Sequence, residues 1–190
     1  MANKTPFSNL IGADEEFVDL GNGAFARLGA LAPIGCVATA NFTPAAGTYI
    51  AGDIVSVAQA FNWTYSNTGQ PVPPGCIVRV FDTSIRVNVT AVEGAEGAYV
   101  LQNYRVTPPS ARADNAAWAA SAADVDAYIE PLSLGTIADL GGFLHVRQRN
   151  VDFDIQLASG SSTHYAELVT TPGLTATAVA RQVRLIGVVL

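Results

Sequence analysis

Lysine is almost absent from this chain of 190 residues, and positive charge is scarce throughout. Lys4 is the only lysine, and sixteen acidic side chains outnumber ten cationic ones, which gives a net charge of −6. A protein that binds nucleic acid through its phosphates needs clustered cations to displace counterions. No such cluster occurs in the sequence, so we expect no nucleic-acid partner.

Long hydrophobic runs are also missing, although 49% of the residues are hydrophobic and the mean hydropathy is +0.28. A helix that crosses a bilayer needs roughly 20 apolar residues in succession, and no stretch approaches that length. We therefore expect no contact with a membrane. The first ten residues, MANKTPFSNL, lack the apolar centre of a signal peptide, so we expect the chain to be made and folded in a cytoplasm.

Charged residues make up only 14% of the chain, against about a quarter in an average soluble domain. We therefore expect a surface that is rich in small and polar side chains such as Ala, Gly, Thr, Ser and Asn, or one that neighbouring subunits cover.

Thiols and imidazoles are too few and too scattered to indicate a reactive site. Cys36 and Cys76 belong to no Cys-x-x-Cys motif, and we interpret them as two small buried hydrophobic residues, with their pairing left open. His145 and His164 each lie in a predicted strand without a nucleophile motif beside them. We therefore expect no catalytic residue, no metal and no cofactor, and we predict that the chain is not an enzyme.

Two Asp-x-Asp patterns are candidate sites, because paired carboxylates can bind calcium or act on a glycosidic bond. The patterns are Asp124 with Asp126 and Asp152 with Asp154. Within a strand, however, alternating aspartates are typical of a solvated face, and we prefer that interpretation. Arg147 and Arg149 belong to a face that could meet an acidic partner.

Most of the chain after residue 30 is typical of short strands separated by turns. The expected strands are residues 36–42, 54–60, 76–81, 85–91, 98–106, 132–137, 143–148, 151–158, 164–169, 174–179 and 181–190. Residues 76–81 and 85–91 are expected to form a hairpin joined by Asp82-Thr83-Ser84, and 181–190 is expected to be a strand that is central or pinned between sheets. This pattern predicts a mainly β fold, an antiparallel β-sandwich that is jelly-roll-like, with one short helical crossover.

Residues 1–30 differ from the rest and are predicted to be an extended N-terminal arm, with residues 31–190 as the sandwich domain. The arm contains acidic residues and glycines around scattered large apolar side chains, and one helical turn is expected over residues 14–20. We expect the arm to lie on a neighbouring subunit, and a disordered tail is the competing interpretation, against which the large apolar residues argue.

The helical insertion is predicted near residues 114–129. Asp114 is a suitable N-cap after Pro108-Pro109, and the segment is rich in alanine. One helical face would carry Trp118, Ala122, Val125 and Ile129. Ser121 and Asp124 form a second capping pattern, so the insertion is either one helix or two short ones. We expect a connector over the edge or open end of the β-structure, anchored by Trp118.

The stretch PPSARADNAAWAASAADVDAYI, which follows the strand AYVLQNYRV, resembles a segment of virion proteins of tailed bacteriophages. The shared pattern is a strand, a proline loop, the run Asp114-Asn115-Ala116-Ala117-Trp118, and then Asp124 and Asp126. The run from Tyr49 to Val55 is similar to their Tyr-x-x-Gly-Asp-aliphatic turn, and the spacing of residues 164–169 and 184–187 also fits. Those proteins often have Leu-Phe before the proline loop, where this chain has Asn103-Tyr104-Arg105.

The resemblance spans roughly residues 42–190 and implies a head decoration (capsid cement) protein. Such a protein would bind the outer surface of the capsid, with the major capsid protein and further copies of itself as partners, and a homotrimer is the expected assembly. It would be made in the host cytoplasm and located on the virion exterior. Two alternatives stay open: another virion component (tail tube, head-spike base or head–tail connector), or a carbohydrate-binding sandwich with Trp63, Tyr65 and Trp118 stacking on sugars.

Overall fold

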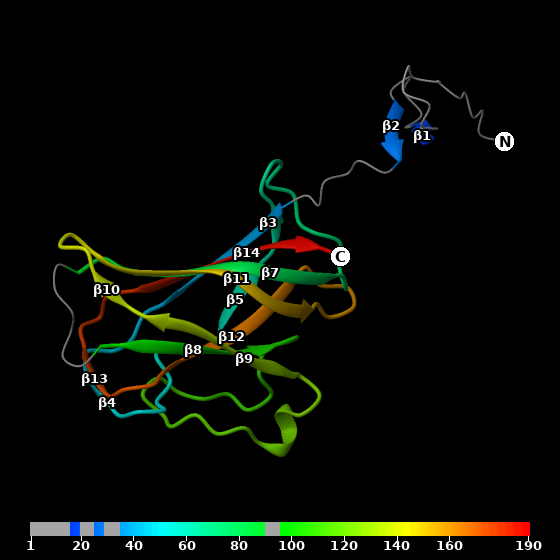
Figure 1. Ribbon diagram of the computed structural model, residues 1–190. Helices are drawn as coiled ribbons and strands as arrows, with labels where there is room; N and C mark the ends of the chain where they lie inside the picture. The colour runs from blue at the N-terminus through cyan, green and yellow to red at the C-terminus, as the bar shows by residue number, and fades with distance from the viewer. Residues whose placement is uncertain (1–15, 20–24, 29–34, 90–95) are drawn as a thin grey trace. The chain divides into compact units, whose positions relative to one another are not determined.

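The computed structural model describes residues 16–19, 25–28, 35–89 and 96–190 (Figure 1). The chain divides into two units, Met1–Ile34 and Gly35–Leu190. In the first unit, β1 (Glu16–Asp19) pairs antiparallel with β2 (Phe25–Leu28). The helical turn expected over residues 14–20 is therefore wrong for 16–19, which form a strand. Most of the expected N-terminal arm lies outside the described residues.

The second unit is an antiparallel β-sandwich whose larger sheet has six strands in the order β10-β11-β7-β14-β3-β6. These strands are β3 (Gly35–Phe42), β6 (Thr64–Tyr65), β7 (Ile77–Val87), β10 (Ala138–Asp139), β11 (Leu144–Gln156) and β14 (Arg181–Val189). As predicted, the C-terminal strand is central, because β14 lies between β7 and β3.

The smaller sheet has four strands in the order β5-β12-β8-β9. They are β5 (Gln59–Asn62), β8 (Ala98–Tyr104), β9 (Tyr128–Thr136) and β12 (Thr163–Thr170), while β4 (Gly47–Tyr49) and β13 (Leu174–Ala176) form a separate pair. Figure 1 shows β7, β11 and β14 in one layer and β8 and β9 in the other. The jelly-roll connectivity expected from the sequence stays a prediction.

Alternation of apolar and polar residues explains which face of each strand enters the core. In β14, Val183 and Leu185 are buried, whereas Arg184 between them is exposed. In β11, Phe153 and Ile155 face the core on either side of the exposed Asp154. Side chains from both sheets thus meet in one apolar interior, as a two-layer sandwich requires.

Two of the predicted turns are interior positions of long strands. The expected hairpin 76–81/85–91 is wrong, because Asp82-Thr83-Ser84 continues β7 without a reversal. Thr83 faces the interior with no exposed surface, and Asp82 pairs with Arg147 on the neighbouring strand. Likewise residues 143–148 and 151–158 belong mainly to one strand, β11, with a register irregularity between Arg149 and Phe153.

The predicted helical insertion near 114–129 is also wrong, except for one 3-10 turn, η1 (Ala122–Asp124). Asn115 has a φ of 63°, outside the helical region. The capping pattern at Ser121 is confirmed, because its hydroxyl accepts from Ala123 N and the Asp124 carboxylate accepts from Ser121 N. The expected strand 54–60 is replaced by an isolated bridge at Ile54, and β5 begins only at Gln59.

Candidate functional site

The segment between β8 and β9, residues 105–127, covers the outer face of the four-stranded sheet. We call it the covering loop; Figure 1 shows it beyond β8 and β9, on the side away from the six-stranded layer. Because the loop covers this face, β8 ends in four consecutive buried residues and β12 in five. A half-exposed sheet would show alternation instead.

Three of the segments in which the sequence resembles phage virion proteins meet where the covering loop contacts the four-stranded sheet, whereas residues 184–187 lie in β14 of the larger sheet. Ile54 N donates to Ala116 O at 2.9 Å, and Asn115 N donates to Ile54 O at 2.9 Å. Ile54 also forms a bridge with Val169 of β12, and Trp118 N donates to Gly52 O at 2.9 Å. Three segments that are distant in the sequence, around residues 52–55, 114–118 and 164–169, therefore form one hydrogen-bonded unit.

Asp114 holds this unit together as an acceptor rather than as a helix cap. Its carboxylate accepts from Ala45 N and Ser56 N, both at 2.6 Å, and from the Tyr49 hydroxyl at 2.8 Å. Ser56 has a φ of 71°, so this bond also fixes a rarely populated backbone conformation. Burial, and then the hydrogen bond to Asp114, raise the pKa of Tyr49 above its ordinary value.

An ion cluster under the loop joins it to the sheet. Arg112 bridges Asp124 and Glu167, with 2.9 Å between Arg112 Nη1 and Glu167 Oε2. The three side chains are 9%, 1% and 0% exposed, respectively. Burial disfavours the Asp124 carboxylate, but amide groups of Ser121 and Ser110 and the Arg112 guanidinium outweigh it and lower the pKa.

Two aromatic side chains, Tyr104 and Trp118, contact the cluster of Arg112, Asp124 and Glu167. Glu167 Oε2 also accepts from the Tyr104 hydroxyl at 2.9 Å and from Trp118 Nε1 at 3.1 Å. The Arg112 guanidinium lies 5.9 Å from the centre of the Trp118 ring, within cation–π range. Trp118 therefore anchors the segment, as expected, although it does so from a loop. Tyr104, which belongs to the run Asn103-Tyr104-Arg105 that departs from the phage pattern, is part of this cluster.

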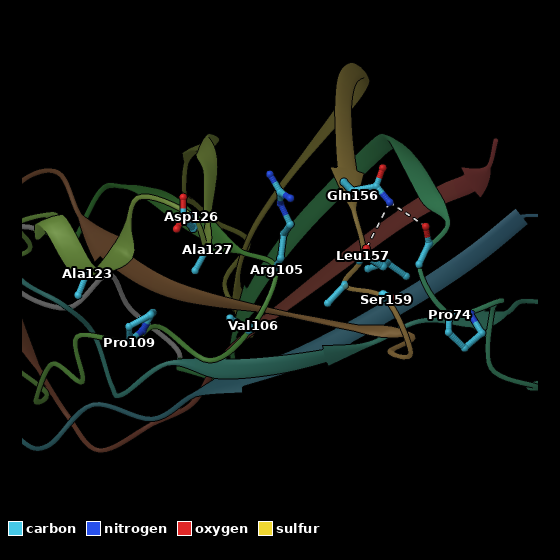
Figure 2. Close-up of a pocket in the computed structure, with 12 residues that line it drawn as sticks. Pro74, Arg105, Val106, Pro109, Ala123, Asp126, Ala127, Gln156, Leu157 and Ser159 are labelled. Atoms are coloured by element: carbon cyan, nitrogen blue, oxygen red, sulfur yellow. Dashed lines mark hydrogen bonds between the residues drawn. The ribbon is translucent and has the colours of Figure 1, made fainter.

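A groove of about 870 Å³ lies along the rim of the covering loop (Figure 2). It is lined by Pro74, Gly75, Arg105, Val106, Pro109, Ala123, Asp126, Ala127, Gln156, Leu157, Ala158 and Ser159. Gln156, the last residue of β11, donates from Nε2 to Gly75 O at 2.7 Å and so links two of the segments that line the groove. The lining offers one guanidinium, one carboxylate, one amide and one hydroxyl among apolar side chains, groups that suit binding by hydrogen bonds and apolar contact.

The histidines singled out in the sequence lie in different surroundings. His164 is fully buried and stacks on Phe61, with ring centres 4.8 Å apart, and its Nδ1 accepts from Trp63 Nε1 at 2.9 Å. His145 is partly exposed on β11 and lies 6.2 Å from the Phe143 ring.

The thiols and acidic pairs are likewise distributed among structural roles. Cys36 is buried and Cys76 half-buried, both as free thiols, and burial raises the pKa of Cys36 to about 11. Asp152 and Asp154 both pair with Arg79 on β7. In the part of the chain that the structure describes, no group of three or more His, Cys, Asp or Glu side chains could hold a metal ion.

Sequence reasoning missed the two buried arginine clusters. Arg112 with Glu167 spans 55 residues, and Arg181 with Glu96 spans 85, with Nε to Oε1 at 3.2 Å in the second pair. No spacing rule links such distant residues. The only local signal was the capping pattern at Ser121 and Asp124, which marked one member of the first cluster.

No helix among the described residues is long and apolar enough to cross a bilayer. Comparison of the chain with models of known protein families gives no match, and comparison with curated proteins gives none either.

Proposed function

We propose that this chain is a structural virion protein that binds the outer surface of a tailed-phage capsid and stabilises it by bridging major capsid subunits. The observation that carries the proposal is the meeting of three of the resembling segments. Residues 49–55, 114–126 and 164–169 resemble phage virion proteins separately in sequence, and in three dimensions they bond to one another. Their contact supports the proposal, because the segments that a family shares are expected to pack together in its fold.

The physical properties of the chain suit a role as a multimeric staple. A chain with 14% charged residues and one lysine is expected to contact its neighbours mainly through small and polar side chains. Modest contacts of this kind become strong retention when many copies bind a repeating lattice, because each further contact is effectively intramolecular. We propose no catalytic role and no cofactor.

In this proposal, residues 1–30 are an arm that crosses to an adjacent subunit, while the sandwich forms the body. The assembly is a homotrimer at threefold positions of the lattice, by analogy with symmetric capsid-binding proteins. The chain is made in the host cytoplasm and ends on the capsid exterior.

The carbohydrate-binding alternative loses its main support. Trp63 has no exposed surface, because its indole lies in the core and donates to His164. It therefore has no free ring face to stack on a sugar, and the platform of Trp63, Tyr65 and Trp118 in that alternative cannot form.

Binding to particles tests the proposed function. Particles produced without this chain should bind the purified protein saturably and sediment with it, and they should resist heat or chelation better once it is bound. Removal of residues 1–30 should weaken binding while the unfolding transition of the sandwich persists. A wild-type chain that stays in the supernatant would contradict the proposal, and retention only on a glycan array would restore the carbohydrate reading.

A further inference from the structure

The outer face of the six-stranded sheet is left open by the described residues of the second unit, 35–89 and 96–190, in contrast to the covered four-stranded sheet. Exposed arginines gather on this side of β7, β11 and β14, three neighbouring strands in Figure 1. We call this surface the basic face; its arginines are Arg79, Arg86, Arg147, Arg149 and Arg184. Their positions follow from the strand alternation, because each projects opposite to the core-facing residues beside it.

Strand register brings these arginines together. Arg147 of β11 and Arg184 of β14 both lie opposite Ser84 of β7. Arg149 lies two residues further along β11, opposite Asp82. Directly opposed residues in antiparallel strands have Cβ atoms about 5 Å apart. The guanidinium groups thus form one patch across three strands, although they are spread over more than a hundred residues of sequence.

The net charge of the basic face has the opposite sign to that of the whole chain. Its five arginines are among nine in the whole chain, and its acidic residues are Asp82, Asp152 and Asp154. The face therefore carries +2, while the rest of the chain carries −8. Two of its arginines are already paired, Arg79 with Asp154 and Arg147 with Asp82. In the described residues, Arg86, Arg149 and Arg184 have no ion-pair partner.

Apolar side chains lie among these charges. Phe81 is 41% exposed and Ile77 is 36% exposed, both on β7 beside Arg79. Arginine with aromatic and aliphatic side chains, and no lysine, is the composition of protein–protein interfaces. A net charge of +2 is too small to hold a phosphate backbone or an anionic lipid surface, which bind through many clustered cations, so a protein partner that also contacts Phe81 and Ile77 fits better than either.

We infer that the basic face is the docking surface for a carboxylate-bearing patch on another protein, which under the proposed function is the outer surface of the capsid. The partner's carboxylates would accept bidentate hydrogen bonds from Arg86, Arg149 and Arg184, while Phe81 and Ile77 supply the apolar contact. A symmetric pair of copies would bring together two faces that each carry a net charge of +2, which disfavours self-association through this face.

A triple variant, Arg86→Gln/Arg149→Gln/Arg184→Gln, tests this inference with particles produced without the chain as the probe. Exposed side chains are changed, so the variant should unfold like the wild type. We expect its apparent affinity for the particles to fall roughly tenfold or more at low salt, and the loss to shrink as added salt screens the wild-type interaction. The matched control, Glu130→Gln/Asp139→Asn, removes exposed charges elsewhere and should bind as well as the wild type.

The outcomes separate this inference from the proposed function on which it rests. If the wild-type chain does not bind the particles, the proposed function fails. If it binds and the triple variant binds equally well across the salt series, the function stands and the docking surface is overturned. Self-association of the wild type that the triple variant loses, or binding of double-stranded DNA that it loses, would also overturn the inference, because the occupant would then be a second copy or a nucleic acid.

Discussion

His164 is the side chain whose protonation has the clearest consequence for stability. Its ring is fully buried, and Nδ1 accepts a hydrogen bond from Trp63, so the neutral ring must carry its proton on Nε2. No partner for Nε2 is present among the described residues. Burial lowers the pKa of His164 from 6.5 to about 3. A charged imidazolium would have neither solvent nor a counter-ion there.

Stability should therefore fall as the pH falls through the ordinary histidine range. Between about pH 6.5 and 3 the unfolded chain binds a proton at this residue and the folded chain does not. The contribution is fully present above pH 6.5, and it is lost below that at up to about 1.4 kcal/mol per pH unit. Urea unfolding between pH 7.5 and 5 measures this slope above the titration of the paired carboxylates.

His164→Gln keeps an acceptor for Trp63 and should flatten the slope, whatever its own stability is. His145→Gln, at the partly exposed histidine, should leave the slope as in the wild type. An unchanged slope in the His164 variant would contradict this assignment.

Arg112 is the second residue with a testable energetic role. Replacement by methionine would leave Asp124 and Glu167 buried without their counter-ion, and such a broken buried pair costs roughly 3 kcal/mol. Chemical denaturation should show this loss in the free energy of unfolding. Adding Glu167→Gln to the Arg112 variant should recover part of it, because one buried charge is then removed. Arg79→Met, at a solvent-exposed pair, should change stability little. Equal losses at both arginines would contradict the role of burial.

At the scale of elements, the covering loop shows why local sequence misled the prediction of a helix. Its alanines favour a helix, yet the backbone groups of Asn115, Ala116 and Trp118 bond to Gly52 and Ile54 instead. Asp114, which could cap a helix, accepts from three groups between residues 45 and 56. Partners about sixty residues away decide the conformation, and single-sequence propensity does not contain them.

The strands β7 and β11 are longer than the sequence predicted, for a related reason. Polar residues at 82–84 and 149–150 look like turns, but they mark irregular places in continuous strands. Alternation did predict that Asp152 and Asp154 lie on a solvated face, because burial on one face is a local pattern, and Phe153 and Ile155 beside them are buried. The presence of strands and the face on which their side chains are buried could therefore be predicted from the sequence. Strand length could not, because it depended on cross-strand partners such as Arg147 with Asp82.

Gly187 gives the sharpest prediction for an element. It lies at the register shift between β14 and β7, where an added Cβ would be 2.6 Å from Arg79 O and 2.8 Å from Val78 Cγ1. Backbone cannot yield locally in a central strand, so Gly187→Ala should destabilise the fold by about 1–3 kcal/mol. Thermal unfolding measures the loss. Gly142→Ala, where the added atom meets nothing within 4 Å, should be nearly neutral. A Gly187 variant as stable as the Gly142 variant would refute the close approach.

At the scale of the whole molecule, the sandwich has one sheet face that its own chain covers and another that presents arginines. The class of fold was predictable, because strand periodicity and turn spacing recur along the chain. The candidate site was only partly predictable. The sequence marked the phage-like segments and Trp118, but their convergence, the Arg112 cluster and the basic face arise from contacts between distant residues.

These features fit a structural protein that acts by binding a lattice in many copies rather than by catalysis. One covered face provides rigidity, and one open face of opposite charge to the molecule provides a direction for docking. A decoration protein needs both, because each copy must hold its shape while it bridges neighbours on a lattice. A tail or connector part would share the fold but would occupy a unique vertex or axis.

The number of copies on purified virions tests this account most directly. Quantitative mass spectrometry of particles, with the major capsid protein as the internal standard, gives the ratio of the two chains. The account predicts a fixed and simple ratio to the major capsid protein, as lattice symmetry requires. About a dozen copies or fewer would match a portal, connector or tail ring and would contradict the account.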